Sequence, residues 1–142
     1  MQTNWKDRAR LFLYAALALS LCLGSSCDAK PYTPKAGSAE RKAILDALRK
    51  PVEKEAKQHV IFYDVSLRVE KGWAFVTAIS KDQTGRKLVL GDLATSGLLR
   101  KKGARWQVLH WGVAGDISVT CEAAKKYPKA PRSIFGATLS AC

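Results

Sequence analysis

The sequence predicts an α+β fold in which one main N-terminal helix packs on a curved antiparallel sheet of about four strands, with a short C-terminal helix. Apolar residues recur at helical spacing between residues 38 and 50, and alternation of apolar and polar residues begins at residue 61. Short glycine-containing turns then separate the apolar runs. The 142 residues, 47% of them hydrophobic and 25% charged, have the length and composition of one domain.

The first 29 residues have the parts of an export signal. Lys6, Arg8 and Arg10 form a positive start, and residues 11–23 are apolar except for Ser20. This run is shorter than the roughly 20 residues that a membrane-spanning helix needs. We therefore expect a cleaved signal peptide rather than a transmembrane anchor, and export to the periplasm or cell envelope.

Two cleavage sites remain open. Cleavage after Ala29 would leave a mature chain that begins at Lys30. Cleavage after Ser26 would instead make Cys27 the lipid-bearing first residue of a bacterial lipoprotein, although Gly24 stands where such signals usually carry leucine. In that case acyl chains, and not a spanning helix, would attach the protein to the membrane.

The main helix is expected to follow an extended tether. Residues 30–37 contain two prolines and a glycine, and the domain proper is predicted over residues 38–142. Ser38 is the predicted N-cap, and the apolar face that follows carries Ile44, Leu45 and Leu48. Pro51 should end or kink the helix because proline lacks a backbone N–H and crowds the preceding turn.

The next two elements are predicted to form an antiparallel hairpin. Apolar residues alternate with polar ones along the first strand, which should place on its buried face Ile61, Tyr63, Val65, Leu67 and Val69. Lys71 and Gly72 make the turn. Residues 73–79 are apolar on both faces, which is typical of a central strand.

A third strand is predicted from residue 95, and a fourth over residues 105–113 after a turn at residues 101–104. Strict alternation would place Trp106, Val108 and His110 on one face of the fourth strand and Trp111 on the other. Residues 117–127 are expected to form the short C-terminal helix, with Asp116 as its cap.

Two cysteines, Cys121 and Cys142, remain once Cys22 leaves with the signal and Cys27 is acylated or removed. In an exported protein such a pair favours a disulfide, which would close a loop of about 22 residues and stabilise the fold by roughly 3 kcal/mol. Two unpaired thiols are the alternative. Neither cysteine lies in a Cys-x-x-Cys pair, so redox catalysis and a zinc ribbon lack support.

Parts of the chain resemble known domains. The run LLRKKGARWQVLHWG resembles the last hairpin of NTF2-like and cystatin-like α+β domains, in which a basic or glycine turn precedes Trp-x-Val. Together with AILDALR, FYDVSLRVEKGWAFV and YPKAPRSIF, it also resembles a group of small exported bacterial proteins of unassigned function, over residues 39–135. The resemblance implies the fold and no activity.

The chain offers few candidate catalytic groups. In the manner of NTF2-like enzymes, His110 and Asp116 would supply a general base and its orienting carboxylate inside a sheet cavity. A His110 that simply packs beside Trp106 or Trp111 is the alternative. Metal-ligand spacings, phosphate loops and dinucleotide motifs are absent from the sequence, so we expect no metal and no cofactor.

The charge indicates an anionic partner. Beyond residue 29 the chain has 21 basic and 10 acidic residues, a net charge of +11. Outside the cytoplasm this charge favours an acidic protein or an anionic envelope polymer as the partner, rather than nucleic acid. We expect contact with the membrane only through the possible lipid anchor. The candidate binding residues are Arg100, Lys101, Lys102, Arg105 and Trp111. We expect a non-catalytic binding domain with an inhibitor, immunity or accessory role. The alternatives are a small NTF2-like enzyme that uses His110 and Asp116, and a basic face that is merely solvated.

Overall fold

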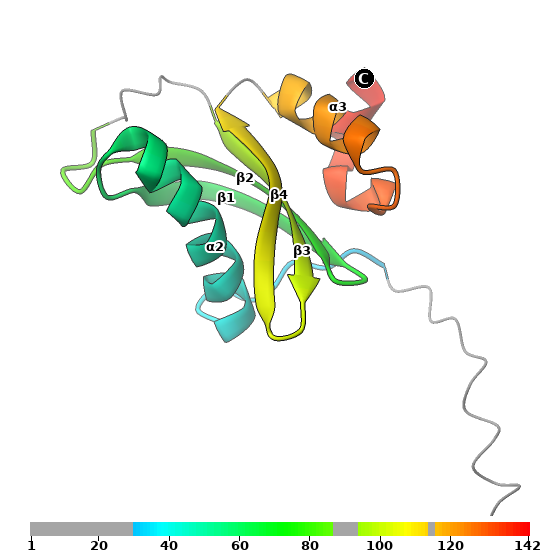
Figure 1. The fold of residues 1–142 in the computed structure, drawn as a ribbon, viewed down its shortest axis with the longest axis horizontal. Helices are drawn as coiled ribbons and strands as arrows, with labels where there is room; N and C mark the ends of the chain where they lie inside the picture. Colours follow the sequence, from blue (N-terminus) through cyan, green and yellow to red (C-terminus); the bar gives the residue numbers. More distant parts are fainter. Residues whose placement is uncertain (1–29, 87–93, 114–115) are drawn as a thin grey trace, which may run out of the picture.

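Four antiparallel strands lie side by side in one sheet, in the order β1-β2-β3-β4 (Figure 1). This computed structural model describes residues 30–86, 94–113 and 116–142; the predicted signal peptide and Cys27 lie outside these ranges. In chain order the elements are α2 (Ala39–Ala56), β1 (Ile61–Glu70), β2 (Trp73–Lys81), β3 (Thr95–Lys102), β4 (Arg105–Val113), α3 (Asp116–Lys126) and the 3-10 segment η1 (Arg132–Ala141). The predicted α+β class, with a helix before the sheet and a short one after it, is confirmed.

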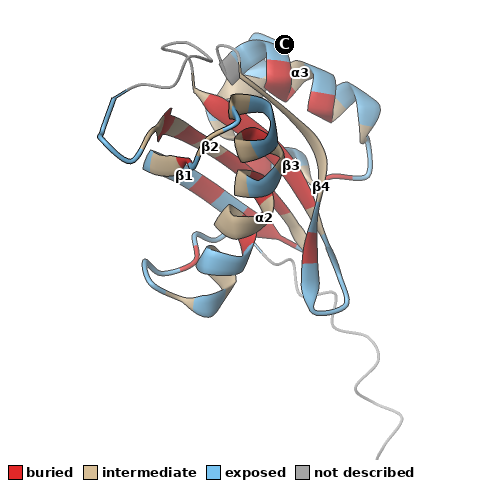
Figure 2. Cartoon of the chain, turned by 60° about the vertical axis from the view of Figure 1, so that its left-hand side comes forward, coloured by how far each residue is buried: buried red, intermediate tan, exposed pale blue. Residues whose placement is uncertain are grey.

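The two faces of the sheet are packed differently. α2 crosses one face, where its Ile44, Leu48 and Val52 form a cluster, the α2 cluster, with residues of all four strands. The strand residues include Leu67, Val76, Leu99 and Trp106. The other face packs against α3 and η1 through Phe75, Leu98, Ala123, Ile134 and Phe135. Figure 2 shows the buried residues concentrated along the strands, with exposed residues on the outer turns of the helices and in the loops. The protein is therefore three-layered, with the sheet in the middle.

α2 begins where the sequence predicts but ends later. The Ser38 Oγ accepts a hydrogen bond from the Arg41 N–H at 3.2 Å, as an N-cap does. The helix does not end at Pro51, as one form of the prediction has it, but continues through Pro51 to Ala56; a kink at Pro51 stays a prediction. It stops where Lys57 takes the left-handed conformation.

Burial explains why α2 tolerates its proline. Ile44, Leu48 and Val52 follow one another at four-residue spacing, and all three side chains are fully buried against the sheet. Ending the helix at Pro51 would withdraw Val52 from this cluster. Packing along the whole stripe therefore outweighs the single backbone hydrogen bond that a proline cannot make.

A β-bulge in β1 changes which residues face the core. Tyr63 pairs with Ile79, yet Ser66 pairs with Thr77, so an extra residue lies in β1 between them. Asp64, within this shift, has a left-handed φ of 46°. The predicted alternation therefore holds only after the bulge. Before it, Phe62 packs against the α2 cluster, while Tyr63 is 40% exposed.

A second bulge lies in β4. Leu98 pairs with His110 and Leu99 with Val108, which leaves one β4 residue between them without a direct partner. Trp111 consequently packs against the same α2 cluster as Val108. His110 shares the opposite face with its partner Leu98. The prediction that Trp106, Val108 and His110 share one face is therefore wrong for His110.

Residues 30–37 are fixed to the sheet rather than serving as a free tether. Tyr32 forms an antiparallel bridge with Val69, with N···O distances of 2.9 and 2.8 Å. The Thr33 Oγ1 also donates to the Leu67 carbonyl at 2.9 Å. The outer edge of β1 carries unpaired backbone groups, and the extended segment satisfies them.

Two arginines of α2 cover further carbonyls of β1 and of the chain that leads into it. The Arg41 Nη2 donates to the Val65 carbonyl at 3.4 Å, and the Arg49 Nε donates to the Val60 carbonyl at 2.9 Å. Such covered edges resist pairing with another chain. The β1 edge is therefore poorly suited to accept a strand from a partner.

The C-terminal segment adds structure that the sequence did not indicate. After Pro131 the chain forms η1, which buries Ile134 and Phe135 against the sheet. The Sγ atoms of Cys121 and Cys142 lie 2.06 Å apart, at disulfide distance. The last residue thus lies next to Cys121 of α3, and the pair is compatible with the predicted disulfide.

Candidate binding surface

Two strand turns meet at one end of the sheet. Lys71 and Gly72 join β1 to β2, and Gly103 and Ala104 join β3 to β4. The Lys101 N–H donates to the Gly72 carbonyl at 2.8 Å, so the two hairpins are hydrogen-bonded where the first one turns. The second hairpin projects further than the first. Trp73, in the last strand pair of the first hairpin, lies opposite Arg100, whereas β3 continues to Lys102, which pairs with Arg105.

The sequence of each turn suits its backbone. Lys71 and Gly72 have φ values of 49° and 73°, and two successive left-handed residues are the pattern of a type I′ hairpin turn. In the second turn only Gly103 has a positive φ, 58°, as at the first central position of a type II′ turn. Both turn types match the natural twist of paired strands.

Aromatic rings position two of the cations. The Arg100 guanidinium lies 4.6 Å from the centroid of the Trp73 ring, and the Lys101 Nζ lies 5.9 Å from that of the Trp106 ring. A cation over an aromatic face is attracted by the electrons of the ring. The Arg100 Nη1 also donates to the Lys71 carbonyl at 2.7 Å, which ties the second hairpin to the first turn.

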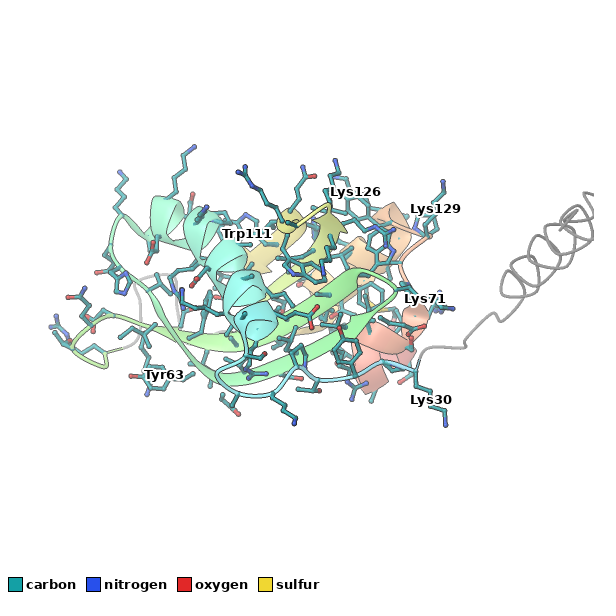
Figure 3. All side chains as sticks on the ribbon, turned by 90° about the horizontal axis from the view of Figure 1, so that it is seen from below. Lys30, Tyr63, Lys71, Trp111, Lys126 and Lys129 are labelled. Carbon is teal, nitrogen blue, oxygen red and sulfur yellow. A yellow bond between two sulfur atoms is a disulfide. The ribbon has the colours of Figure 1, made fainter. Side chains whose placement is uncertain are left out.

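We call this cluster the basic end, and it comprises Lys71, Arg100, Lys101, Lys102 and Arg105. All of these residues are exposed except Arg100, which is half-buried. Figure 3 shows Lys30, Lys126 and Lys129 at the same end of the molecule as Lys71, away from Tyr63. Positive charge thus extends beyond the two turns to the start of the described chain and to the segment after α3.

One carboxylate flanks the basic end. Glu70 is buried, with 8% of its surface exposed, and accepts a hydrogen bond from the Ser133 hydroxyl. Its Oε1 lies 3.9 Å from the Lys71 Nζ. Lys101, Lys102 and Arg105 form no ion pair with any carboxylate in the described ranges. The outer part of the basic end therefore keeps its charge for a partner.

Of the five predicted binding residues, four lie together and Trp111 does not. Trp111 pairs with Gly97, six residues along β4 from Arg105, which corresponds to about 20 Å of extended strand. It is half-buried and packs against the α2 cluster. The tryptophans that lie near the cations are Trp73 and Trp106. Hairpin register could have indicated the pairing of Lys101 with Trp106, since both flank the β3–β4 turn. Trp73 and Arg100 pair across β2 and β3, which no tight turn joins, so the sequence carries no comparable signal for them.

The candidate catalytic histidine contacts a different carboxylate from the expected one. The His110 Nε2 lies 3.4 Å from the Glu122 Oε2 of α3. Asp116 opens α3, but its side chain lies outside the part that the structure describes, so its pairing with His110 stays a prediction. The sequence does not indicate the contact of His110 with Glu122, because only the bulge in β4 places His110 on the face that packs against α3.

Cavities and metal-ligating groups give little support to catalysis. Three cavities in the described ranges are lined by residues other than His110. Phe75 and Trp106 are buried on opposite faces of the sheet and fill space there. Within the residues that the structure describes, no three His, Cys, Asp or Glu side chains gather as a metal site would require.

Comparisons with protein-family models, with curated proteins and with solved structures found no match. The resemblance to NTF2-like and cystatin-like domains therefore stays a prediction. Among residues 30–86, 94–113 and 116–142, no helix has both the length and the apolar character needed to cross a membrane.

Proposed function

We propose that the protein is an exported, non-enzymatic binding domain of the cell envelope that holds an acidic protein at its basic end. Its role would be that of an inhibitor, an immunity protein or an accessory factor. The observation that carries this proposal is the clustering of Lys71, Arg100, Lys101, Lys102 and Arg105 on two hydrogen-bonded hairpins, where the flanking Glu70 is already bonded.

The geometry of the turns favours a folded partner over a flexible polymer. Arg100 is held between the Trp73 ring and the Lys71 carbonyl, and Lys101 lies over Trp106. Side chains that are already positioned lose less conformational freedom on binding. A fixed pattern of charges on rigid hairpins can match a fixed pattern of carboxylates, and such complementarity gives specificity and fast association.

The rival enzymatic function has weaker support. His110 is half-buried beside Glu122, and this pair lies on the surface between β4 and α3. The Glu122 side chain is 70% exposed. A general base in a sheet cavity would instead need a shaped, water-excluding space around it.

A binding experiment with two charge-matched variants tests the proposal. Residues 30–142 contain every described element and would be titrated against polyglutamate, which probes the attraction for carboxylates and not the fold of the partner, and, separately, against vesicles containing phosphatidylglycerol. One variant carries Lys101→Gln, Lys102→Gln and Arg105→Gln. The control carries Lys50→Gln, Lys54→Gln and Lys57→Gln, which removes three exposed cations from the C-terminal part of α2 and just after it.

We expect the basic-end variant to lose about tenfold or more in affinity for polyglutamate, while the control changes by about twofold or less. Equal losses of affinity in both variants would show that binding depends only on the net charge of the protein, and would contradict the proposal. Binding to vesicles alone would move the partner from an acidic protein to an anionic envelope component.

A further inference from the structure

A cavity separate from the basic end lies between the β1–β2 hairpin and η1. Its volume is about 260 Å³, and it lies on the face of the sheet opposite α2. The polar residues that line it are Ser66, Arg68, Thr77 and Thr138, and Phe75 and Phe135 form part of its wall. The space thus combines one guanidinium and three hydroxyls with aromatic surface.

Arg68 is exposed and lines this cavity beside the backbone of η1. Its Nη1 lies 3.5 Å from the Ser133 carbonyl, a long hydrogen bond. Gly136 has a φ of 65°, and a Cβ placed there would stand 2.8 Å from the same Nη1. The left-handed backbone conformation favours glycine at position 136, and a side chain there would displace the end of the Arg68 side chain from its place.

The positive charge of Arg68 is not neutralised within the described part of the chain. No carboxylate lines the cavity, and no described carboxylate forms an ion pair with Arg68. Glu70, two residues further along β1, accepts from the Ser133 hydroxyl and approaches Lys71 instead. Four of the five guanidinium N–H groups make no hydrogen bond to a described residue.

The larger groove along α2 differs from this cavity, because its cations already have partners within the protein. It measures about 490 Å³ and is lined by Arg41, Lys42 and Arg49 among others. Arg41 donates to the Pro34 and Val65 carbonyls, while Lys42 and Arg49 both pair with Asp46. Its cations are engaged by the protein itself, whereas Arg68 is available to a ligand.

The lining and size of the Arg68 cavity define the chemistry of a ligand. A planar guanidinium can donate two parallel hydrogen bonds to a carboxylate, and hydroxyls can donate to the same group. The volume corresponds to about nine water molecules in the liquid, so it suits a small group and not a polymer. Phe75 and Phe135, whose ring centroids are 4.9 Å apart, favour an apolar body beside the charge.

We propose that this cavity binds the carboxylate of a small apolar organic acid or of a peptide C-terminus. Arg68 forms the ion pair, and the hydroxyls of Ser66 and Thr138 add hydrogen bonds. The site is independent of the basic end, so either proposal can fail without the other.

The test is a titration of residues 30–142, with the cysteines oxidised, monitored by ¹H–¹⁵N NMR. The probes are hexanoate, the neutral hexanamide, and the peptide acetyl-Ala-Phe with a free or an amidated C-terminus. The readouts are the amide signal of Gly136 and the Nε–H signal of Arg68. Arg68→Gln removes the guanidinium, and Arg132→Gln is the charge-matched control at the start of η1.

We expect hexanoate, but not hexanamide, to shift the Gly136 signal, with at least about a tenfold loss of affinity in Arg68→Gln and about twofold or less in Arg132→Gln. If the free-acid peptide also binds, the carboxylate of the natural ligand can be that of a peptide C-terminus. If only hexanoate binds, the natural ligand is a small organic acid. Equal binding of amide and acid, equal losses in the two variants, or no shift at Gly136 would overturn the proposal.

Discussion

Gly97 of β3 lies directly beneath Leu48 of α2: a Cβ placed at Gly97 would stand 2.5 Å from the Leu48 Cδ1. Leu48 is fully buried, and the absent side chain at position 97 lets the helix approach the sheet there. The same glycine pairs across the strands with Trp111, which packs against the same cluster. The close approach of Leu48 to β3 thus depends on the glycine at position 97.

Gly97→Ala should therefore destabilise the protein by about 1–3 kcal/mol, because overpacking forces Leu48 out of its rotamer or the helix off the sheet. Urea unfolding measures the loss. Gly112→Ala is the matched control, since its Cβ would meet Val119 Cγ2 at 3.0 Å and needs only a small adjustment. A Gly97→Ala variant as stable as the wild type would contradict the packing described here.

The Cys121–Cys142 pair should stabilise the fold if it is oxidised in the mature protein. Cys142→Ser is then expected to lower the free energy of unfolding by roughly 3 kcal/mol, because the unfolded chain regains the freedom of the closed loop. Cys121→Ser should cost a similar amount, and the double variant should cost no more than either alone. Additive losses would indicate two separate thiols.

Asp46 should make the protein sensitive to acid. Its hydrogen bond from Lys42, aided by Arg49 and opposed by partial burial, holds the pKa of the carboxyl below its ordinary value of 3.8. A lowered pKa in the folded state contributes stability that is present above the unfolded pKa and lost as the pH falls through the folded one.

Asp46→Asn should consequently be less stable than the wild type at pH 7, and the difference should shrink as the pH falls below about 4. Urea unfolding at a series of pH values between 2 and 7 measures this. A difference that stays constant across the series would show that the ion pairs with Lys42 and Arg49 do not stabilise the fold.

The bulge in β1 gives a prediction about backbone conformation. Asp64 has a φ of 46°, which costs a residue with a side chain roughly 1 kcal/mol and costs glycine much less. Asp64→Gly should therefore keep or raise the melting temperature. Asp64→Val should lower it, since a β-branched residue fits this conformation poorly. The reverse order would mean that the bulge does not form.

The sequence predicted the order and type of the main elements because their signals are local. The alternation around Leu67 and Val76, the turn at Lys71 and Gly72, and the cap at Ser38 each depend on a few neighbouring residues. The pairing of Cys121 with Cys142 followed from cysteine counting and export, and the cysteine pair does lie at disulfide distance.

What the sequence could not indicate depends on tertiary contacts. A bulge adds one residue to a strand without a distinctive pattern, so the faces of Tyr63, His110 and Trp111 were predicted from an alternation that the bulges interrupt. The cavity at Arg68 is formed by residues of β1 and β2 together with residues of η1, which lie far apart in the chain. For the basic end, the sequence shows the cluster of cations, and hairpin register indicates the pairing of Lys101 with Trp106. The contact of Arg100 with Trp73 depends on the pairing of β2 with β3, which no tight turn sets.

The most direct test of the proposed function is affinity capture from a bacterial envelope extract at rising salt. The baits are residues 30–142, the basic-end variant and the α2 control variant. We predict that one acidic protein stays on the wild type and the control at near-stoichiometric amount through moderate salt, and is lost from the basic-end variant. If the control loses the same protein equally, or if nothing remains on the wild type once salt is raised, the basic end is not a dedicated binding surface.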